Sequence, residues 1–239
     1  MAESVRSGLG MLADSISDAV AEVRPKLRGW LHLGTAPLAL AAGVVLVALA
    51  PDGRPRLGAA VFAGSAFLLF TVSAIYHRWS LTHGFREVLK RWDHANIFVL
   101  IAGTYTPFAL VLLHGSARAW LLSLVWGGAV LGMGFRVFWQ GAPRWLYVPI
   151  YLALGWAALF FIPALFHGAL ALGMGIGIAT FVLICVGGAL YTLGGVVYGF
   201  KRPNPWPRVF GFHEVFHTFT ILAFAAHYTG ASLAIYALR

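Results

Sequence analysis

Gly211-Phe-His-Glu-Val-Phe-His217 begins an apolar run that reaches about Tyr236, and it carries two histidines four residues apart. On an α-helix this spacing places His213 and His217 on one face, one turn apart, with about 5–6 Å between their Cβ atoms. Histidines at the end of a membrane helix indicate either a metal site or a costly exception. The question for the remaining sequence is whether other side chains converge on this pair.

The composition is that of a membrane protein with several spans. The 239 residues are 60% hydrophobic and 10% charged, whereas soluble domains carry about 25% charged residues, and the mean hydropathy is +0.80. Nine Trp and eight Tyr fit aromatic belts at the two membrane surfaces. Basic loops explain the net charge of +9 better than nucleic-acid binding does. The single Cys185 excludes an intrachain disulfide and a cysteine-based zinc site.

We expect an all-α fold in which residues 28–239 form a seven-helix transmembrane bundle. Residues 1–27 are a polar N-terminal segment whose apolar residues recur every three or four positions, which predicts a short amphipathic helix; a frayed tail is the alternative. No cleavable signal peptide is expected there. Runs near the ~20 apolar residues that a bilayer requires occur at 30–50, 57–78, 92–113, 118–138, 145–166, 169–199 and 212–236. The weakest break is His167-Gly168.

Seven spans divide the basic residues unequally between the two sides of the membrane. Of the 17 lysines and arginines, the side away from the N-terminus holds only Arg54, Arg56, Arg118 and Arg239. The positive-inside rule therefore predicts a cytoplasmic N-terminus and a C-terminus outside. Merging two helices would break this alternation, which supports seven spans independently.

This topology brings side chains from four spans to the same depth on the cytoplasmic side. They are His32 of the first span, Ser73 and His77 of the second, Asp93 of the third, and His213 and His217 of the seventh. Three neutral imidazoles with water as the fourth ligand form the pattern of a catalytic zinc site. We predict Zn²⁺ bound by His77, His213 and His217; a hydrogen-bonded polar cluster without metal is the alternative.

The neighbouring polar residues have roles that zinc chemistry implies. Zinc lowers the pKa of a bound water toward about 7. A carboxylate beside the ligands holds that water and accepts its proton, which is the role predicted for Asp93. Ser73 is expected to donate a hydrogen bond nearby.

The same residues stand in ordered motifs. These are Ser73-Ala-Ile-Tyr-His77, Asp93-His-Ala-Asn-Ile-Phe, Ile101-Ala-Gly-Thr-Tyr-Thr-Pro107 and His213-x-x-x-His217. From about Arg28 to the C-terminus the chain resembles the hemolysin III family, bacterial relatives of the progestin and adiponectin receptors.

The resemblance implies a multi-pass protein of the bacterial cell membrane with seven helices and a cytoplasmic N-terminus. It also implies a zinc ion near the inner leaflet, held by the three histidines, with the Ser and Asp beside them. The wider superfamily includes alkaline ceramidases, which suggests hydrolysis of a lipid amide. Related proteins often begin the first span with E-x-x-N-x-x-x-H, and this chain keeps only His32 of that pattern.

One stretch carries a second interpretation. His213-Glu214-Val-Phe-His217 fits H-E-x-x-H, in which Glu is the general base of a zinc protease. A third ligand from His227 would lie roughly 15 Å further along the helix, so we favour Glu214 as a polar residue at the helix start.

The other histidines are open to plainer interpretations. His32 is either a partner of the metal ligands or an interfacial residue. His94 points about 100° away from Asp93 on a helix, which favours a surface role. His227 is expected to be hydrogen-bonded within the bundle.

Three functions remain from the sequence. The first is a zinc-dependent hydrolase of an amide or ester bond in a membrane lipid, the second a sensor or regulator of membrane lipid composition with a structural zinc, and the third a pore-forming haemolysin. Polar residues gather on one side and spans four to six carry few charges, which argues against a pore. The lipid and the oligomeric state stay open.

Overall fold

The computed structural model describes residues 25–79, 82–139 and 141–239, so the amphipathic helix predicted within residues 1–27 lies almost wholly outside them. Seven spans within this described part are long and apolar enough to cross a membrane, which confirms the all-α seven-span prediction. The helices are α2 (Trp30–Leu49), α3 (Arg54–Arg78), α4 (His83–Leu112), α5 (Gly115–Phe138), α6 (Arg144–Gly155), the 3₁₀ turn η1 (Ala157–Phe161), α7 (Ile162–Leu170), α8 (Met174–Phe200) and α9 (Phe212–Tyr236).

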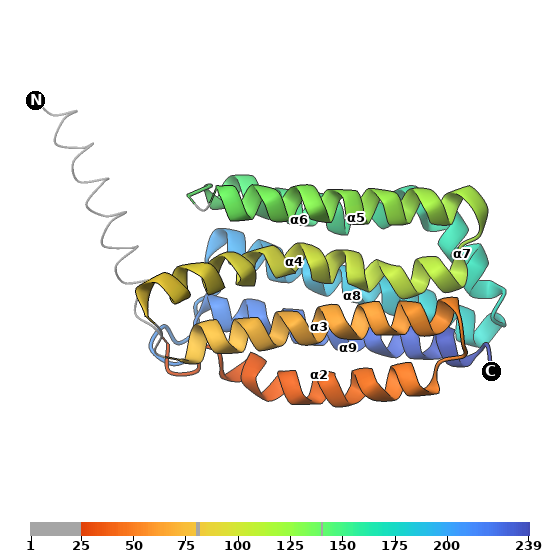
Figure 1. Cartoon of the computed structure of the whole chain (residues 1–239), viewed down its shortest axis with the longest axis horizontal. Helices are drawn as coiled ribbons and strands as arrows, with labels where there is room; N and C mark the ends of the chain where they lie inside the picture. Colours follow the sequence, from red (N-terminus) through yellow and green to blue (C-terminus); the bar gives the residue numbers. More distant parts are fainter. Residues whose placement is uncertain (1–24, 80–81, 140) are drawn as a thin grey trace, which may run out of the picture.

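The helices run side by side along one long axis (Figure 1). Each helix from α2 to α5 packs on the next, α8 packs on α9, and α9 closes the bundle against α2 and α3. The central helix is α4, since 67% of its apolar window is buried, against 17% in α8. The side chains that meet inside the bundle therefore come mainly from α3, α4 and α9.

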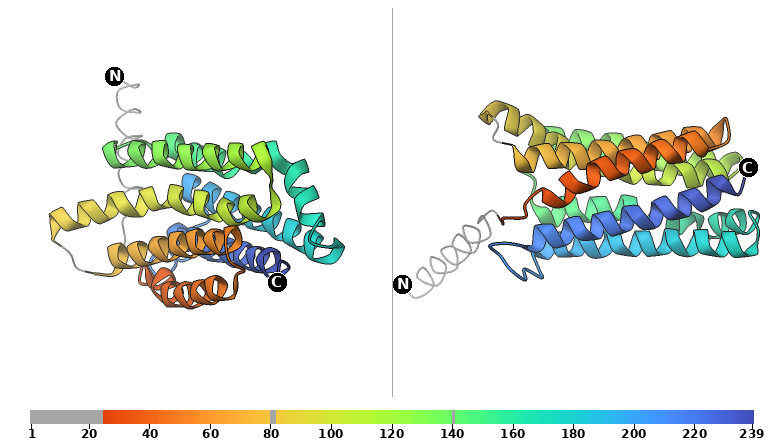
Figure 2. Two further views of the ribbon diagram at one scale, coloured as in Figure 1. Left: turned by 45° about the vertical axis from the view of Figure 1, so that its right-hand side comes forward. Right: turned by 90° about the horizontal axis from the view of Figure 1, so that it is seen from below.

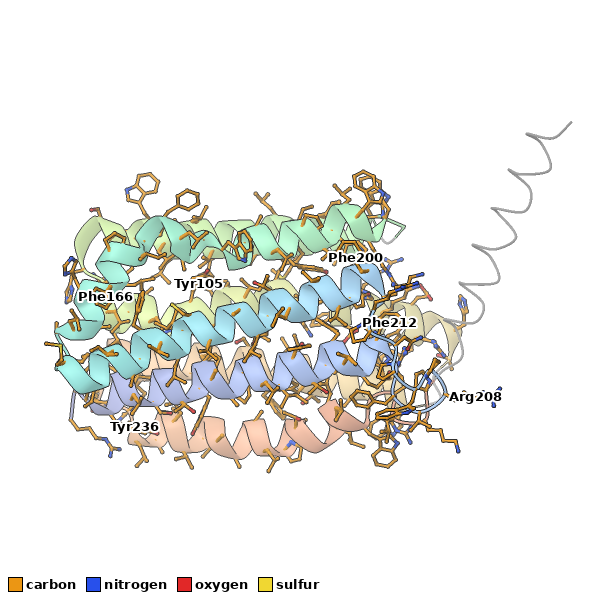
Figure 3. The ribbon with its side chains drawn as sticks, turned by 180° about the vertical axis from the view of Figure 1, so that it is seen from behind. Tyr105, Phe166, Phe200, Arg208, Phe212 and Tyr236 are labelled. Atoms are coloured by element: carbon orange, nitrogen blue, oxygen red, sulfur yellow. The ribbon has the colours of Figure 1, made fainter. Side chains whose placement is uncertain are left out.

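The two ends of the bundle differ in the helix termini and side chains that lie there. Helices α2, α4, α6 and α9 begin at the end that we call the histidine end, and α3, α5 and α8 finish there (Figure 2). Arg208 and Phe212 lie at this end, whereas Phe166 and Tyr236 lie at the other (Figure 3). That the histidine end faces the cytoplasm stays a prediction.

Two span boundaries differ from those expected. The third span begins at His83 rather than at 92, because a charged helical turn extends α4 beyond its apolar part. The break before α8 lies at residues 171–173, and Gly168 is inside α7. A Cβ on Gly168 would stand 2.0 Å from the carbonyl oxygen of Leu112. This glycine permits close helix packing and does not mark a turn.

The fifth span is broken between α6 and α7. Pro163 comes after the break, and proline has no N–H with which to continue a helical ladder. The hydroxyl of Tyr105 on α4 donates to the carbonyl of Gly155 at 2.5 Å and accepts the N–H of Ala158 at 3.0 Å. Backbone groups freed at membrane depth need such partners from neighbouring helices. Tyr105 therefore makes the broken span compatible with a bilayer.

Replacing Tyr105 with Phe should lower the stability of the bundle. The variant leaves a part-buried carbonyl and a part-buried N–H unpaired, at a cost of up to about 1–3 kcal/mol each, and thermal unfolding in detergent should occur at a lower temperature. Tyr236→Phe is the matched control, since the Tyr236 hydroxyl is buried without a partner in the described structure. Equal unfolding temperatures for the two variants would contradict the assigned role.

Candidate metal centre

The segment before α2 is tied to the loop before α9. Lys26 donates its backbone N–H to the carbonyl of Arg208 at 3.0 Å, and the next residue donates to Val209 at 3.1 Å. Gly29 then turns with φ of 81°, a conformation that favours glycine. A Cβ there would also lie 2.7 Å from the Cβ of His77. The start of α2 thus packs directly on the end of α3.

Glu214 holds the first turn of α9 in place. Its side chain is fully buried. Oε1 accepts a hydrogen bond from Nε of Arg28 at 2.5 Å, and Oε2 accepts the N–H of Gly211 at 2.9 Å. A carboxylate at a helix N-terminus is also favoured by the helix dipole. Both oxygens are engaged, so the arrangement supports a structural Glu214 over the general base of a zinc protease.

Three histidines meet at this end of the bundle. His77 ends α3, His213 and His217 occupy the first two turns of α9, and their candidate ligand atoms all lie within 4.8 Å of one another. The Nε2 atoms of His77 and His213 are 3.2 Å apart. Two nitrogens bound tetrahedrally at about 2.0–2.1 Å would stand about 3.3–3.4 Å apart. The donor set and its spacing therefore fit a metal ion.

Asp93 and Ser73 lie beside the three histidines. Oδ2 of Asp93 is 3.8 Å from Nε2 of His77, which is the same nitrogen that faces His213. The carboxylate is therefore on the metal-facing side of the imidazole ring. Ser73, one turn before His77, is buried and lines the same cavity as Asp93. Asp93 is thus within reach of a water on a bound ion, and Ser73 is placed to orient it.

His32 is a buried partner of the ligands, not an interfacial residue. It is 2% exposed, and its ring stacks on that of His217 with centroids 3.7 Å apart and planes 9° apart. Neither ring nitrogen has a hydrogen-bond partner among the described residues. The stacking restricts the orientation of the His217 ring, and His32 also lines a cavity inside the bundle.

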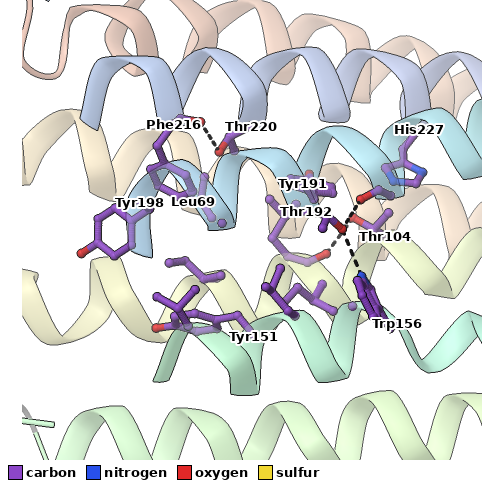
Figure 4. Close-up of a pocket in the computed structure, with 18 of the residues that line it drawn as sticks. Leu69, Thr104, Tyr151, Trp156, Tyr191, Thr192, Tyr198, Phe216, Thr220 and His227 are labelled. Carbon is purple, nitrogen blue, oxygen red and sulfur yellow. Dashed lines mark hydrogen bonds between the residues drawn. The ribbon is translucent and has the colours of Figure 1, made fainter. Parts of the chain in front are cut away.

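This long cavity extends from the histidines into the bundle. Its volume is ≈ 170 Å³, whereas a single water needs about 10–15 Å³ by the same measure. The end of the cavity at the histidines is polar and is lined by His32, Ser73, Asp93, His213 and His217. Its walls are mostly apolar or aromatic, with Tyr151 and Phe216 among the side chains drawn in Figure 4. The shape and lining suit a chain-like apolar ligand.

The far end of the cavity contains a further histidine. The ring of His227 stacks on Tyr191 with centroids 5.6 Å apart, and its Nδ1 has no hydrogen-bond partner in the described part of the chain. The expectation of a hydrogen-bonded His227 is therefore wrong for that nitrogen. Gly187 explains how the imidazole fits, because a Cβ there would stand 2.4 Å from Nε2 of His227.

His94 also lines the cavity, so the predicted surface role is wrong. Its Nδ1 bonds the carbonyl of Lys90 at 2.7 Å, and the ring of Tyr147 on α6 lies edge-on to it at 6.4 Å. The packing of α6 against α4 covers this face, and no local spacing in the sequence could show that. Nor does any local pattern identify Arg28 as the partner of Glu214, since the two are 186 positions apart.

The sequence is similar to a described protein family and to individual proteins of other organisms. A family model described as "Haemolysin-III related" matches residues 21–228. A hemolysin-3 homolog of Bacillus subtilis (strain 168) is 33% identical over 167 residues, 70% of this chain and 71% of that protein. A hemolysin-3 of Bacillus cereus is 31% identical over 162 residues, 67% of each chain. The heptahelical transmembrane protein ADIPOR2 of Oryza sativa subsp. japonica is 26% identical over 200 residues, 76% of this chain and 83% of that protein.

His77→Ala should abolish metal binding, because the two remaining imidazoles come from α9 alone and no longer bridge it to α3. Elemental analysis of detergent-purified protein should give about one zinc per wild-type chain and almost none in the variant. His83→Ala is the control, since His83 is exposed at the same end of the bundle. Equal zinc content in His77→Ala and wild type would contradict the site.

Glu214→Gln should destabilise the protein while leaving its metal in place. Loss of the charge-assisted hydrogen bond to Arg28 should cost about 1.5–3 kcal/mol in thermal or denaturant unfolding. Asp52→Asn tests the corresponding exposed pair with Arg56, which should contribute about 0–1 kcal/mol. A Glu214→Gln protein of wild-type stability would show that the pair does not hold α9.

Proposed function

The chain belongs to the haemolysin-III related family of membrane proteins, and we propose that it is a zinc-dependent hydrolase of an amide or ester bond in a membrane lipid. The observation that carries the proposal is the position of Asp93 beside three histidines at the polar end of an apolar cavity. The proposal includes Zn²⁺ held by His77, His213 and His217. It also includes a bacterial cell membrane as location, with the histidine end at the cytoplasmic face.

Each residue of the site has a role in such a reaction. A zinc ion held there would supply a Lewis acid and a bound water that is acidic near neutral pH. Asp93 takes the proton from the attacking water and delivers it to the leaving nitrogen or oxygen. Ser73 orients the Asp93 carboxylate, and His32 keeps the His217 ring in its orientation by stacking.

The cavity provides the selectivity for lipids. From His217 to His227 the helix rises by roughly 15 Å, and both residues line the same cavity. An acyl chain placed along this space has its carbonyl at the polar end, next to Asp93. The apolar walls exclude bulk water from the chain, while the polar residues near the histidines remain available to the reacting bond.

The two other functions make different demands on the same residues. A regulator with a structural metal requires the three histidines but does not require a proton acceptor beside them. A pore, which the names of the Bacillus relatives suggest for those proteins, needs a polar path from one end of the bundle to the other. The single carboxylate of this cavity, Asp93, and all its imidazoles except His227 lie at the histidine end, which favours chemistry there.

Asp93→Asn should retain zinc and lose activity. Because the amide cannot accept the proton, turnover of fluorogenic acyl amides and esters should fall by about 10²–10⁴. Zinc content is measured on the same preparation, and Asp52→Asn, an exposed carboxylate at the opposite end, is the control.

Three outcomes would contradict the proposed hydrolase or the role of Asp93 in it. Unchanged turnover with zinc retained removes Asp93 as the proton acceptor. A zinc-loaded wild type that turns over no amide or ester lipid favours the regulator. Leakage of a trapped dye from liposomes that is equal for wild type and Asp93→Asn favours the pore.

A further inference from the structure

Two arginines at the histidine end have no acidic partner among the described residues. Arg136 lies in the last turn of α5 and is 4% exposed, and Arg144 is the first residue of α6. Elsewhere in the described part of the chain, Arg28 pairs with Glu214 and Arg56 with Asp52. Arg136 lacks such a counter-charge, although a buried cation without one is strongly disfavoured.

Aromatic rings surround the two guanidinium groups. Cζ of Arg136 lies 4.3 Å from the ring centroid of Tyr147, and Cζ of Arg144 lies 5.0 Å from that of Tyr198. The hydroxyls of Tyr147 and Tyr198 are 3.3 Å apart. The two arginine–tyrosine pairs are therefore neighbours and form one cationic cluster, which we call the arginine–tyrosine cluster.

The cluster has donors that the described protein does not satisfy. Nη1 of Arg136 reaches the carbonyl of Trp139 at 3.4 Å. Nε of Arg136 and Nη1 of Arg144 are buried and lack any hydrogen-bond partner among the described residues. Unpaired guanidinium N–H groups from two residues in one place indicate that an acceptor with several oxygens belongs there.

The helix dipole partly stabilises the charge of Arg136 but not that of Arg144. A cation is stabilised at a helix C-terminus, where Arg136 lies, whereas at a helix N-terminus an anion is stabilised and a cation is not. Arg144 begins α6, and the preceding Pro143 makes no side-chain cap. An anion next to Arg144 would accept from its guanidinium and also face the first turn of α6.

We propose that the arginine–tyrosine cluster binds the phosphate group of a lipid headgroup. Guanidinium forks match phosphate oxygens in bidentate geometry, and the ends of membrane spans lie at the depth of lipid phosphates. The ring of Tyr198 also lies 5.9 Å from that of His213 and lines the main cavity. The cluster is thus a separate anion site beside the polar end of the cavity, and it uses none of the residues assigned to metal or proton transfer.

The test is native mass spectrometry of the full chain in a non-ionic detergent, titrated with phosphatidylglycerol and with uncharged diacylglycerol. Wild type should bind about one phosphatidylglycerol per chain and no diacylglycerol. The double variant Arg136→Gln/Arg144→Gln should bind phosphatidylglycerol at least about tenfold more weakly. Arg54→Gln/Arg118→Gln, which removes two arginines at the opposite end, should bind as wild type does.

Two further arms keep the proposal falsifiable. Arg136→Lys/Arg144→Lys keeps the charge without the fork, so it should bind more weakly than wild type but more strongly than the Gln variant, and it replaces the Gln variant if that fails to fold. Millimolar inorganic phosphate should compete only weakly. Thermal stabilisation by inorganic phosphate, with no phosphatidylglycerol adduct, would overturn the assignment to a lipid.

Equal phosphatidylglycerol binding by wild type and both arginine variants would overturn the site itself. The result is independent of the proposed hydrolase, because phosphatidylglycerol binding should survive in Asp93→Asn and in the metal-free His77→Ala protein. Loss of turnover in those variants with binding intact separates the two proposals.

Discussion

Every polar group that the seven apolar spans bring into the bundle needs a partner inside the protein, because hydrocarbon offers none. Tyr105 meets this need where the fifth span breaks, and Glu214 meets it by joining Arg28 to the start of α9. Among the buried groups for which the described protein supplies no partner, the ring nitrogens of His32 lie beside the cavity and Nε of Arg136 lies at the histidine end. These two positions are suited to a ligand.

The candidate metal centre depends on the same internal partners. His213 and His217 are adjacent through the helix itself, but His77 comes from α3 and requires the two helices to meet at one depth. The buried Glu214 and the backbone bonds of residues 26–27 to 208–209 lock that junction. The ligands are therefore held before any ion binds, which reduces the ordering that binding requires.

Composition and local spacing were sufficient to predict the seven spans and the histidine cluster. Most spans are separated by polar or charged breaks between apolar runs, although residues 171–173 before α8 carry no polar side chain. The cluster comes from an i, i+4 pair combined with span direction. Prediction failed where the answer depends on distant packing. The sequence favours a break at Gly168, whereas in the structure this glycine permits close contact with Leu112. Hydropathy predicts a start of α4 that is too late, because it reports apolar composition, whereas the helix also includes the polar turns from His83 onward. The burial of His94 depends on the packing of α6 against α4, which the sequence does not show.

The candidate metal centre and the arginine–tyrosine cluster constrain each other. The ring of Tyr198 contacts Arg144 on the one hand and His213 on the other, so the proposed phosphate and the proposed reacting bond lie on either side of one aromatic side chain. A lipid that fills both sites carries its scissile bond only a few atoms from its phosphate. Glycerophospholipid esters and phosphate-bearing lipid amides both have that arrangement, whereas neutral lipids have no phosphate to place. Taken together, the two proposals favour a phosphate-bearing lipid as the substrate, with either an ester or an amide as the bond that breaks.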